Sequence, residues 1–216
     1  MDSFDAFAER LAGIPAPLFT INPYQGQDMA GLIRRQNLSH YLGRMAGRRP
    51  RLLLVGEAPG YRGCGVTGVP FTSEALLMSG RSTFDLFGAS AGFRPAGSES
   101  RWKREATATI MWRALEEIGV LPLLWNAFPF HPHGPDQPAS NRPPKPGELE
   151  LGRRILPDLL ALFDIAQVIA VGNKAAAALS DWGIPAERVR HPSRGGKLRF
   201  ERELAQLVAA DGAGTA

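Results

Sequence analysis

Residues 51–60 read Arg51-Leu52-Leu53-Leu54-Val55-Gly56-Glu57-Ala58-Pro59-Gly60, a short apolar run followed by a turn. The run has no polar alternation, which is typical of a strand buried on both faces in a parallel sheet. The glycines and the proline predict a stiff turn whose backbone can approach a ligand closely. Open α/β sheets bind ligands beyond the carboxyl ends of their strands. We therefore expect an α/β fold with a site at this turn.

Length and composition predict one domain over residues 1–216. The chain has 216 residues, 44% of them hydrophobic, which is enough for a sizeable core. No segment has the uninterrupted apolar length of a membrane span, and the first residues are acidic where a secretory signal is basic. The single cysteine, Cys64, excludes an internal disulfide and any cluster held by several thiolates. We expect a cytoplasmic protein.

Basic residues are unevenly distributed along the chain. The formal net charge is +4, from 25 basic and 21 acidic residues, but basic side chains gather in segments 34–51, 101–104 and 188–202. Trp102 lies inside the second group. Basic groups beside aromatic residues suit a polyanion such as DNA. Judged by charge alone, however, these basic residues are better interpreted as ordinary solvated surface. Whether the protein binds DNA must be inferred from other motifs.

The coarse pattern predicts a three-layer α/β/α fold with a central four-stranded parallel sheet. The expected strands are 51–55, 121–125, 167–171 and 187–190. The expected helices are 2–12, 27–47, 73–79, 103–119, 148–163, 174–181 and 199–209. Residues 1–50 form a helical segment packed on the domain, and 210–216 a frayed tail. The loop 127–147 contains seven prolines and has the length of a functional or disordered loop.

Polar residues follow each expected strand. They are Glu57, Asn126, Asn173 and His191. Because the carboxyl ends of parallel strands lie along one edge, these four turns should form one polar cleft.

His191 begins a segment rich in hydrogen-bond donors. An imidazole can supply a hydrogen bond or a positive charge to a developing anion. The segment continues with Ser193, Arg194, Gly195, Gly196, Lys197 and Leu198. Glycines let backbone N–H groups approach phosphates, and the polar side chains add donors. A lone histidine would more simply cap a loop, but this flank favours a functional role.

Asn126 and Phe71 have the chemistry needed to hold a planar base. The Asn126 amide carries a donor and an acceptor, which matches a base edge with one N–H and one C=O. A turn-forming asparagine is an equally good interpretation. Phe71 can stack on an extruded base, although a core phenylalanine is the simpler interpretation of that residue alone.

Three other motifs point to no chemistry. His131-Pro132-His133 lacks further ligands at metal-binding spacing, so we expect surface loop and no metal. Gly172-Asn173-Lys174 lacks the pattern of a nucleoside-triphosphate loop and is interpreted as structural. Cys64 has no identifiable histidine partner.

Taken in order, the motifs resemble the uracil-DNA glycosylase superfamily over about residues 50–200. The matching segments are residues 56–60, Thr67-Gly68-Val69-Pro70-Phe71, Trp125-Asn126-Ala127, Asn141-Arg142-Pro143 and His191-Pro192-Ser193. Each is weak alone, whereas all of them in order are fairly specific.

The Gly-Glu-Ala-Pro-Gly turn looks most like the bacterial and archaeal branch that carries an iron–sulfur cluster. Two of that branch's cluster cysteines align with Phe130 and Gly152 here, and its amino-terminal cysteine pair is missing. The departure implies that the chain has no iron–sulfur cluster or other cofactor, with apolar packing in its place. Residues 67–71 instead look like the single-strand-selective branch, which has no cluster. We therefore expect the chain to belong to a branch that is intermediate between these two or separate from both.

The resemblance implies a role for each matching residue. His191 would stabilise the charge growing on uracil O2, Asn126 would read the N3/O4 edge, and Phe71 would stack on the base. The backbone of Gly56, Ala58, Pro59 and Gly60 would line the pocket. Glu57 would place the water, although the aspartate of the most active branch aligns with Ala58. Residues 193–197 would grip phosphates, and Leu198 or Arg194 would fill the vacated stack.

The expected function is a monofunctional uracil-DNA glycosylase that acts on single- or double-stranded DNA as a monomer, without metal or membrane. Three alternatives stay open. They are a glycosylase of the same fold for hypoxanthine or xanthine, a non-catalytic nucleic-acid binding module, and a small-nucleotide hydrolase.

Overall fold

A computed structural model describes residues 2–80, 84–97, 101–193 and 195–213. Its main sheet contains β2 (Leu52–Gly56), β3 (Leu123–Asn126), β5 (Gln167–Val171) and β6 (Glu187–Val189). The four strands are parallel and run in the order β3-β2-β5-β6. Every residue of β2 is buried, as its unbroken apolar run predicts for a central parallel strand. The expected α/β sheet is therefore confirmed.

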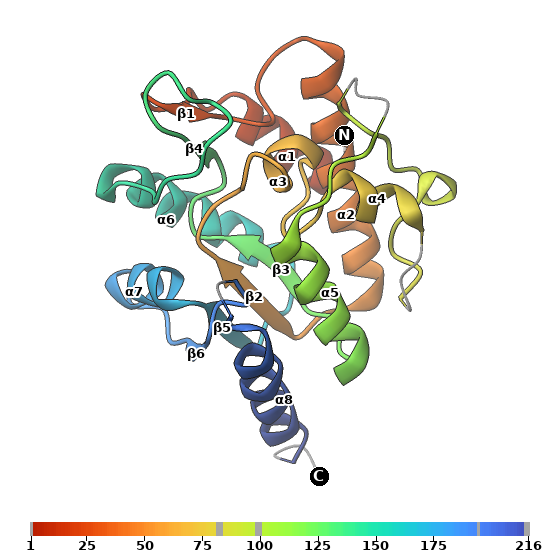
Figure 1. Ribbon diagram of the computed structural model, residues 1–216, viewed down its shortest axis with the longest axis vertical. Helices are drawn as coiled ribbons and strands as arrows, with labels where there is room; N and C mark the ends of the chain where they lie inside the picture. Colours follow the sequence, from red (N-terminus) through yellow and green to blue (C-terminus); the bar gives the residue numbers. More distant parts are fainter. Residues whose placement is uncertain (1, 81–83, 98–100, 194, 214–216) are drawn as a thin grey trace.

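Helices cover both faces of the sheet (Figure 1). In that view α5 (Ala106–Ile118) and α8 (Lys197–Ala213) lie in front of the sheet and contact each other. Behind it lie α1 (Ser3–Ala12) and α6 (Pro146–Leu160), which the ion pair between Arg10 and Asp158 joins. The remaining elements are α2 (Met29–Arg48), α3 (Cys64–Thr67), α4 (Glu74–Ser79), the 3-10 helix η1 (Ala89–Ala91) and α7 (Asn173–Asp181).

The amino-terminal helices are part of the hydrophobic core. Phe7 of α1 packs against Trp125 of β3 with ring centroids 5.6 Å apart. Tyr41 of α2 is fully buried, and its hydroxyl accepts a hydrogen bond from the backbone N–H of Leu124. These two helices thus contribute directly to the packing of the strand that carries Asn126.

A second, two-stranded sheet was not expected from the sequence. In it β1 (Thr20–Ile21) pairs antiparallel with β4 (His131–Pro132), so Ile21 lies opposite His131. The prediction that His131 lies in a surface loop is wrong, because only 2% of its surface is exposed. Two residues per strand carry no periodic signal, so this pairing depends on distant parts of the chain meeting.

Helix ends also differ from the expectation. Helix α5 begins at Ala106 rather than 103, because the Glu105 carboxylate accepts the N–H groups of Thr107 and Ala108 as an N-cap. Helix α6 begins at Pro146 rather than 148, with the proline in its first turn. Helix α8 continues to Ala213, so the tail expected to fray from residue 210 is helical that far.

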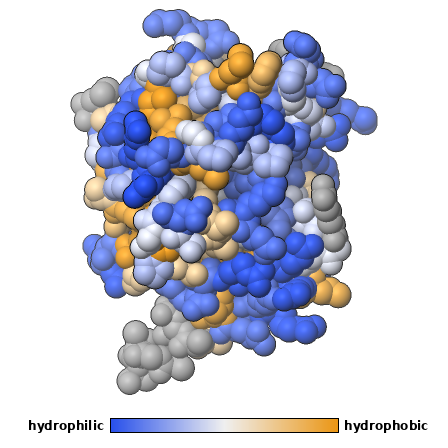
Figure 2. Space-filling view, turned by 90° about the vertical axis from the view of Figure 1, so that its left-hand side faces the viewer, coloured by the Kyte–Doolittle hydropathy of each residue, from blue (hydrophilic) through white to orange (hydrophobic). Residues whose placement is uncertain are grey.

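Hydrophilic residues cover most of the face over β4, α6 and α7, with smaller hydrophobic groups between them (Figure 2). Across the described residues, no helix is both long and apolar enough to cross a lipid bilayer.

Candidate active site

The four polar strand ends converge on one cavity of about 540 Å³, as expected from the parallel sheet. Glu57 follows β2, Asn126 ends β3, Asn173 begins α7 after β5, and His191 follows β6. All four line the cavity, together with Ala58, Pro59, Gly60 and Phe71. This size is typical of a site for a small organic group.

Gly56 allows Phe71 and Asn126 to lie close to the same point of the backbone. A Cβ atom at Gly56 would lie 2.4 Å from Cζ of Phe71 and 2.9 Å from Oδ1 of Asn126. Phe71 itself has φ of 52°, a left-handed conformation that is costly for a bulky residue. Its carbonyl oxygen accepts a hydrogen bond of 2.9 Å from the Trp112 indole, which holds this conformation. The Phe71 ring and the Asn126 amide are thus held next to each other.

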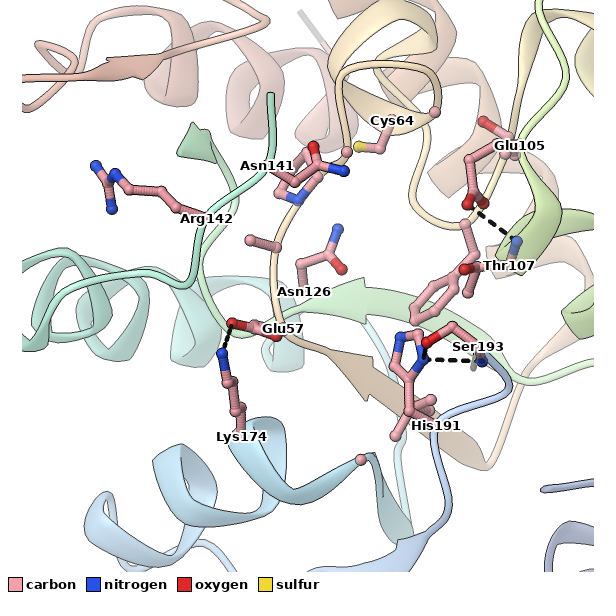
Figure 3. A pocket seen from close by; sticks show the side chains of 18 of the residues that line it. Glu57, Cys64, Glu105, Thr107, Asn126, Asn141, Arg142, Lys174, His191 and Ser193 are labelled. Atoms are coloured by element: carbon pink, nitrogen blue, oxygen red, sulfur yellow. Dashed lines mark hydrogen bonds and ion pairs between the residues drawn. The ribbon is translucent and has the colours of Figure 1, made fainter. Parts of the chain in front are cut away.

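The Asn126 side chain is 5% exposed and points into the cavity (Figure 3). Within the described ranges its amide group has no hydrogen-bond partner. Polar side chains that are this little exposed are normally paired within the protein. A donor and an acceptor are therefore held ready for a ligand.

The tautomer of His191 follows from its neighbours. The backbone N–H of Ser193 donates to Nδ1 of His191 at 3.2 Å, and the Ser193 hydroxyl lies 2.8 Å from the same nitrogen. Because a backbone amide can only donate, Nδ1 is the acceptor and the neutral ring carries its hydrogen on Nε2. The Nε2 edge of the ring points into the cavity (Figure 3).

Two glycines position the His191 backbone. Gly172 has φ of 91°, and a Cβ atom there would lie 3.0 Å from Cβ of His191. A Cβ atom at Gly196 would lie 2.1 Å from the His191 carbonyl oxygen. The role of Gly196 in this structure is therefore close packing beneath the histidine.

Glu57 forms an ion pair that the sequence did not suggest. Its Oε1 atom lies 3.3 Å from Nζ of Lys174, at the start of α7. The carboxylate turns toward Lys174 rather than toward His191 (Figure 3). Oε1 is buried and accepts no hydrogen bond from the described residues, so the contact is an ion pair without hydrogen-bond geometry. Lys174, interpreted from sequence as structural, thus belongs to the cavity wall.

Glu105 and Thr107 form the opposite wall (Figure 3). Both carboxylate oxygens of Glu105 are used in capping α5. The sequence signal for this cap, an acid directly before a helical repeat, was available, but nothing in it indicated a cavity.

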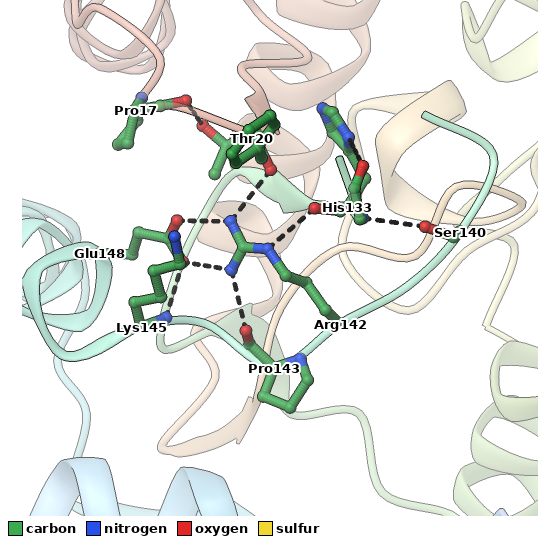
Figure 4. A network of polar contacts seen from close by, with 10 residues as sticks. Pro17, Thr20, His133, Ser140, Arg142, Pro143, Lys145 and Glu148 are labelled. Carbon is green, nitrogen blue, oxygen red and sulfur yellow. Dashed lines mark hydrogen bonds and ion pairs between the residues drawn. The ribbon is translucent and has the colours of Figure 1, made fainter. Parts of the chain in front are cut away.

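Arg142 lines the cavity, but its guanidinium points away from the other polar groups there and supports the loop (Figure 3). Its guanidinium donates to both carboxylate oxygens of Glu148, at 2.8 and 2.6 Å, and to the carbonyl oxygens of Phe19, His133 and Pro143 (Figure 4). Burial alone would raise the pKa of Glu148, but the hydrogen bonds from Arg142 and Lys145 outweigh it and hold that pKa below its ordinary value. The neighbouring Asn141 accepts a hydrogen bond from the Tyr61 N–H and lines the cavity.

Cys64 lines the cavity and His131 is buried beside it, but neither has a catalytic environment. Nδ1 of His131 lies 2.9 Å from the Pro59 carbonyl oxygen and Nε2 lies 3.1 Å from that of Pro138. Burial lowers the pKa of His131, so the neutral ring donates to one of these carbonyls. Burial raises the pKa of the Cys64 thiol to about 12, which makes it a poor nucleophile.

The predicted phosphate-binding segment lies beside His191. Ser193 is turned toward the histidine, whereas Gly195 has φ of 74° and Lys197 begins α8 with its ammonium 3.7 Å from Glu201. Leu198 is 72% exposed. Asn173 accepts a hydrogen bond from Arg188 at 2.6 Å. Arg194 lies outside the described residues.

The two positions aligned with cluster cysteines do not fit an iron–sulfur cluster. Phe130 is fully buried, with its ring 5.6 Å from that of Phe128. A Cβ atom at Gly152 would lie 1.7 Å from the Ala127 carbonyl oxygen, so a cysteine there would displace α6 from the strand end. The described residues contain no group of three or more His, Cys, Asp and Glu side chains that could hold a metal ion.

A family model identifies the superfamily of the chain, and a solved structure matches its fold. Residues 43–209 match the family model described as "Uracil DNA glycosylase superfamily". Among solved structures, the crystal structure of wild-type SMUG2 from Pedobacter heparinus matches with a TM-score of 0.67 and 14% sequence identity, covering 99% of each chain. At that identity the likeness shows the fold. The comparison with curated proteins gives no match.

Proposed function

The chain belongs to the uracil DNA glycosylase superfamily and is thus a DNA glycosylase; we propose that it removes uracil by hydrolysing the N-glycosidic bond. One observation carries this proposal. The Nε2–H of His191 and the Asn126 amide point into one cavity that Phe71 also lines. Together they match the carbonyls, the N–H edge and the flat face of a pyrimidine.

Each of these groups has one task in the proposed reaction. A uracil flipped out of the DNA stack enters the cavity and lies on Phe71. Asn126 donates to O4 and accepts from N3–H, a pattern that cytosine does not offer. His191 donates its Nε2 hydrogen to O2, where negative charge develops as the bond to the sugar breaks.

Water must then attack the sugar. Of the two carboxylates that line the cavity in the described structure, Glu105 is occupied as a helix cap, which leaves Glu57 to orient the water. In this proposal the ion pair with Lys174 fixes the Glu57 side chain.

We propose that the reaction is monofunctional and needs no cofactor. Lys174 lines the cavity, but its ammonium is paired with Glu57 rather than held as a free amine nucleophile. The close packing of Gly152 and the burial of Phe130 support a site without an iron–sulfur cluster.

The test is excision from a labelled oligonucleotide with one uracil. We expect abasic sites that become breaks only after alkali treatment, and no borohydride-trapped protein–DNA adduct. Parallel oligonucleotides with hypoxanthine or xanthine test the base. If the protein binds the oligonucleotide but releases no base, it is a non-catalytic binding module. If it consumes only free nucleotides, it is a nucleotide hydrolase.

A further inference from the structure

Trp102 is a surface tryptophan in a chain that buries other tryptophans. It is 51% exposed, whereas Trp112 and Trp125 are among the largest fully buried side chains. Of the large hydrophobic side chains exposed in the described part of the chain, it is the only aromatic one. Tryptophan is enriched where proteins contact other molecules, because its wide face binds at little entropic cost.

The backbone around Trp102 is held in place by a buried carboxylate. Glu74, 2% exposed, accepts hydrogen bonds from the backbone N–H groups of Gly97, at 3.1 Å, and Lys103, at 3.2 Å. The N–H of Ala75 donates to the Lys103 carbonyl oxygen. A Cβ atom at Gly97 would lie 2.4 Å from Oε1 of Glu74, so the glycine is required for this contact. The exposed position of Trp102 is therefore imposed by the fold.

The immediate neighbours of Trp102 in the sequence are basic. Arg101, Lys103 and Arg104 flank it, and both arginines are exposed. The nearest acid described after them, Glu105, has both oxygens engaged with the start of α5. A flat aromatic face between guanidinium groups suits a base of a nucleic acid strand with its phosphates on either side.

Trp102 lies near the cavity along the chain. Glu105 and Thr107 line the cavity, and Trp102 precedes Glu105 by three residues. This segment leads into the amino-terminal end of α5 (Figure 1). Three residues span at most about 10 Å, and successive bases of a strand are about 3.4 Å apart. The Trp102 backbone is thus within about three base steps of Glu105 in the cavity wall.

We propose that Trp102, flanked by Arg101 and Arg104, is a stacking site for an unpaired base of the DNA strand, within about three nucleotides of the excised base. The inference rests on the proposed function in taking DNA as the ligand. An indole can stack only on a base whose face is exposed, so single strands gain from this contact and a paired duplex does not.

Intrinsic fluorescence tests the proposal without catalysis. The probe is a short single-stranded thymidine oligonucleotide that contains no uracil. We expect it to quench the emission of the wild-type protein, and Trp102→Leu to remove most of that quenching. The same variant should bind the probe about 5- to 150-fold more weakly, the range found when an aromatic stacking residue is removed. Trp102→Tyr keeps a ring and should retain most of the affinity.

Trp182→Phe is the matched control, because Trp182 is only partly buried and lies at the far end of α7 from the cavity residue Lys174. It should change neither the quenching nor the affinity. Unchanged quenching in Trp102→Leu, or an equal loss of affinity for a fully paired duplex, would overturn the proposal. Trp102-dependent quenching in a protein that releases no uracil would refute the proposed function alone. Uracil release without such quenching would refute the stacking site alone.

Discussion

At the scale of single residues, the site consists of groups whose orientation is fixed before any ligand binds. The Ser193 N–H sets the tautomer of His191, and the Trp112 indole holds Phe71 in a left-handed conformation. Donors arranged in advance toward developing charge need no reorganisation during the reaction, which is why they contribute strongly to rate.

Replacing His191 with alanine should lower uracil excision about 10²- to 10³-fold, because the variant lacks one fixed donor to the departing base. DNA affinity should change little. Single-turnover excision and equilibrium binding measure the two effects separately. His133→Ala is the control, since this histidine is not among the residues that line the cavity. Excision by His191→Ala at the wild-type rate would refute the assigned role.

Replacing Asn126 with aspartate should relax discrimination against cytosine. A protonated carboxyl group can donate to cytosine N3 and accept from its exocyclic amine, whereas the amide presents the opposite pattern. Excision of cytosine from an oligonucleotide, followed over a range of pH, should rise as the carboxyl group gains its proton. If cytosine excision stays undetectable at every pH, Asn126 does not read the base edge in this way.

At the scale of elements, Arg142 makes five hydrogen bonds that link parts of the segment between β3 and α6 to one another and to its surroundings. Its guanidinium binds the Glu148 carboxylate in the first turn of α6 (Figure 4). It also donates to the carbonyl oxygen of Phe19, the residue before β1. Asn141, one residue earlier, thereby reaches the cavity beside Gly60. A loop rich in proline thus becomes part of the site through interactions with segments remote from it in sequence.

The Arg142–Glu148 pair should make stability depend on pH. In the folded protein the pKa of Glu148 is below its ordinary value. The ionised carboxylate therefore stabilises the fold fully at pH values above the ordinary pKa. This stabilisation is lost as the pH falls through the lower pKa of the folded state. Glu148→Gln should lower the free energy of unfolding by about 1.5–3 kcal/mol at neutral pH, because the partly buried Arg142 guanidinium loses its charged partner. The difference from wild type should shrink as the solution is acidified.

Urea unfolding from neutral to acidic pH measures this difference. Glu150→Gln is the control, since Glu150 forms only exposed pairs with Arg153 and Arg154 on the same helix and should change stability by less than about 1 kcal/mol. A Glu148→Gln difference that does not vary with pH would contradict the assignment.

At the scale of the whole molecule, the parallel sheet brings its strand ends, the polar turns and the start of α8 to one edge. Between β6 and α8, Ser193 lines the cavity together with His191, and Lys197 begins α8 four residues later in the chain. We therefore expect two contributions to DNA affinity. The pocket recognises the base, and basic side chains bind phosphates whatever the DNA sequence.

Affinity for a DNA duplex should fall steeply as salt rises. The double substitution Arg194→Ala and Lys197→Ala should reduce the slope of log affinity against log salt by about two, one for each phosphate that the variant no longer neutralises. Arg153→Ala with Arg154→Ala removes the same charge from α6 and is the control. Equal slopes in the wild type and the first double variant would show that these residues do not bind phosphates.

Much of the site could be predicted from sequence because its residues stand at strand ends. The apolar run before Gly56 and the motifs at Asn126 and His191 are local features, and the parallel order of the strands places them together. The contribution of Glu105 and Thr107 could not be predicted in this way, since a helix cap carries no sign that it faces a cavity.

The amino-acid sequence was sufficient to establish the parallel α/β architecture, the polar turns and the family resemblance, because apolar runs and turn residues act on their near neighbours. The folded molecule was needed to show that Glu57 pairs with Lys174, that β1 pairs with β4, and that Gly56 admits both Phe71 and Asn126. These interactions join residues far apart in the chain, and they depend on distances that packing alone sets.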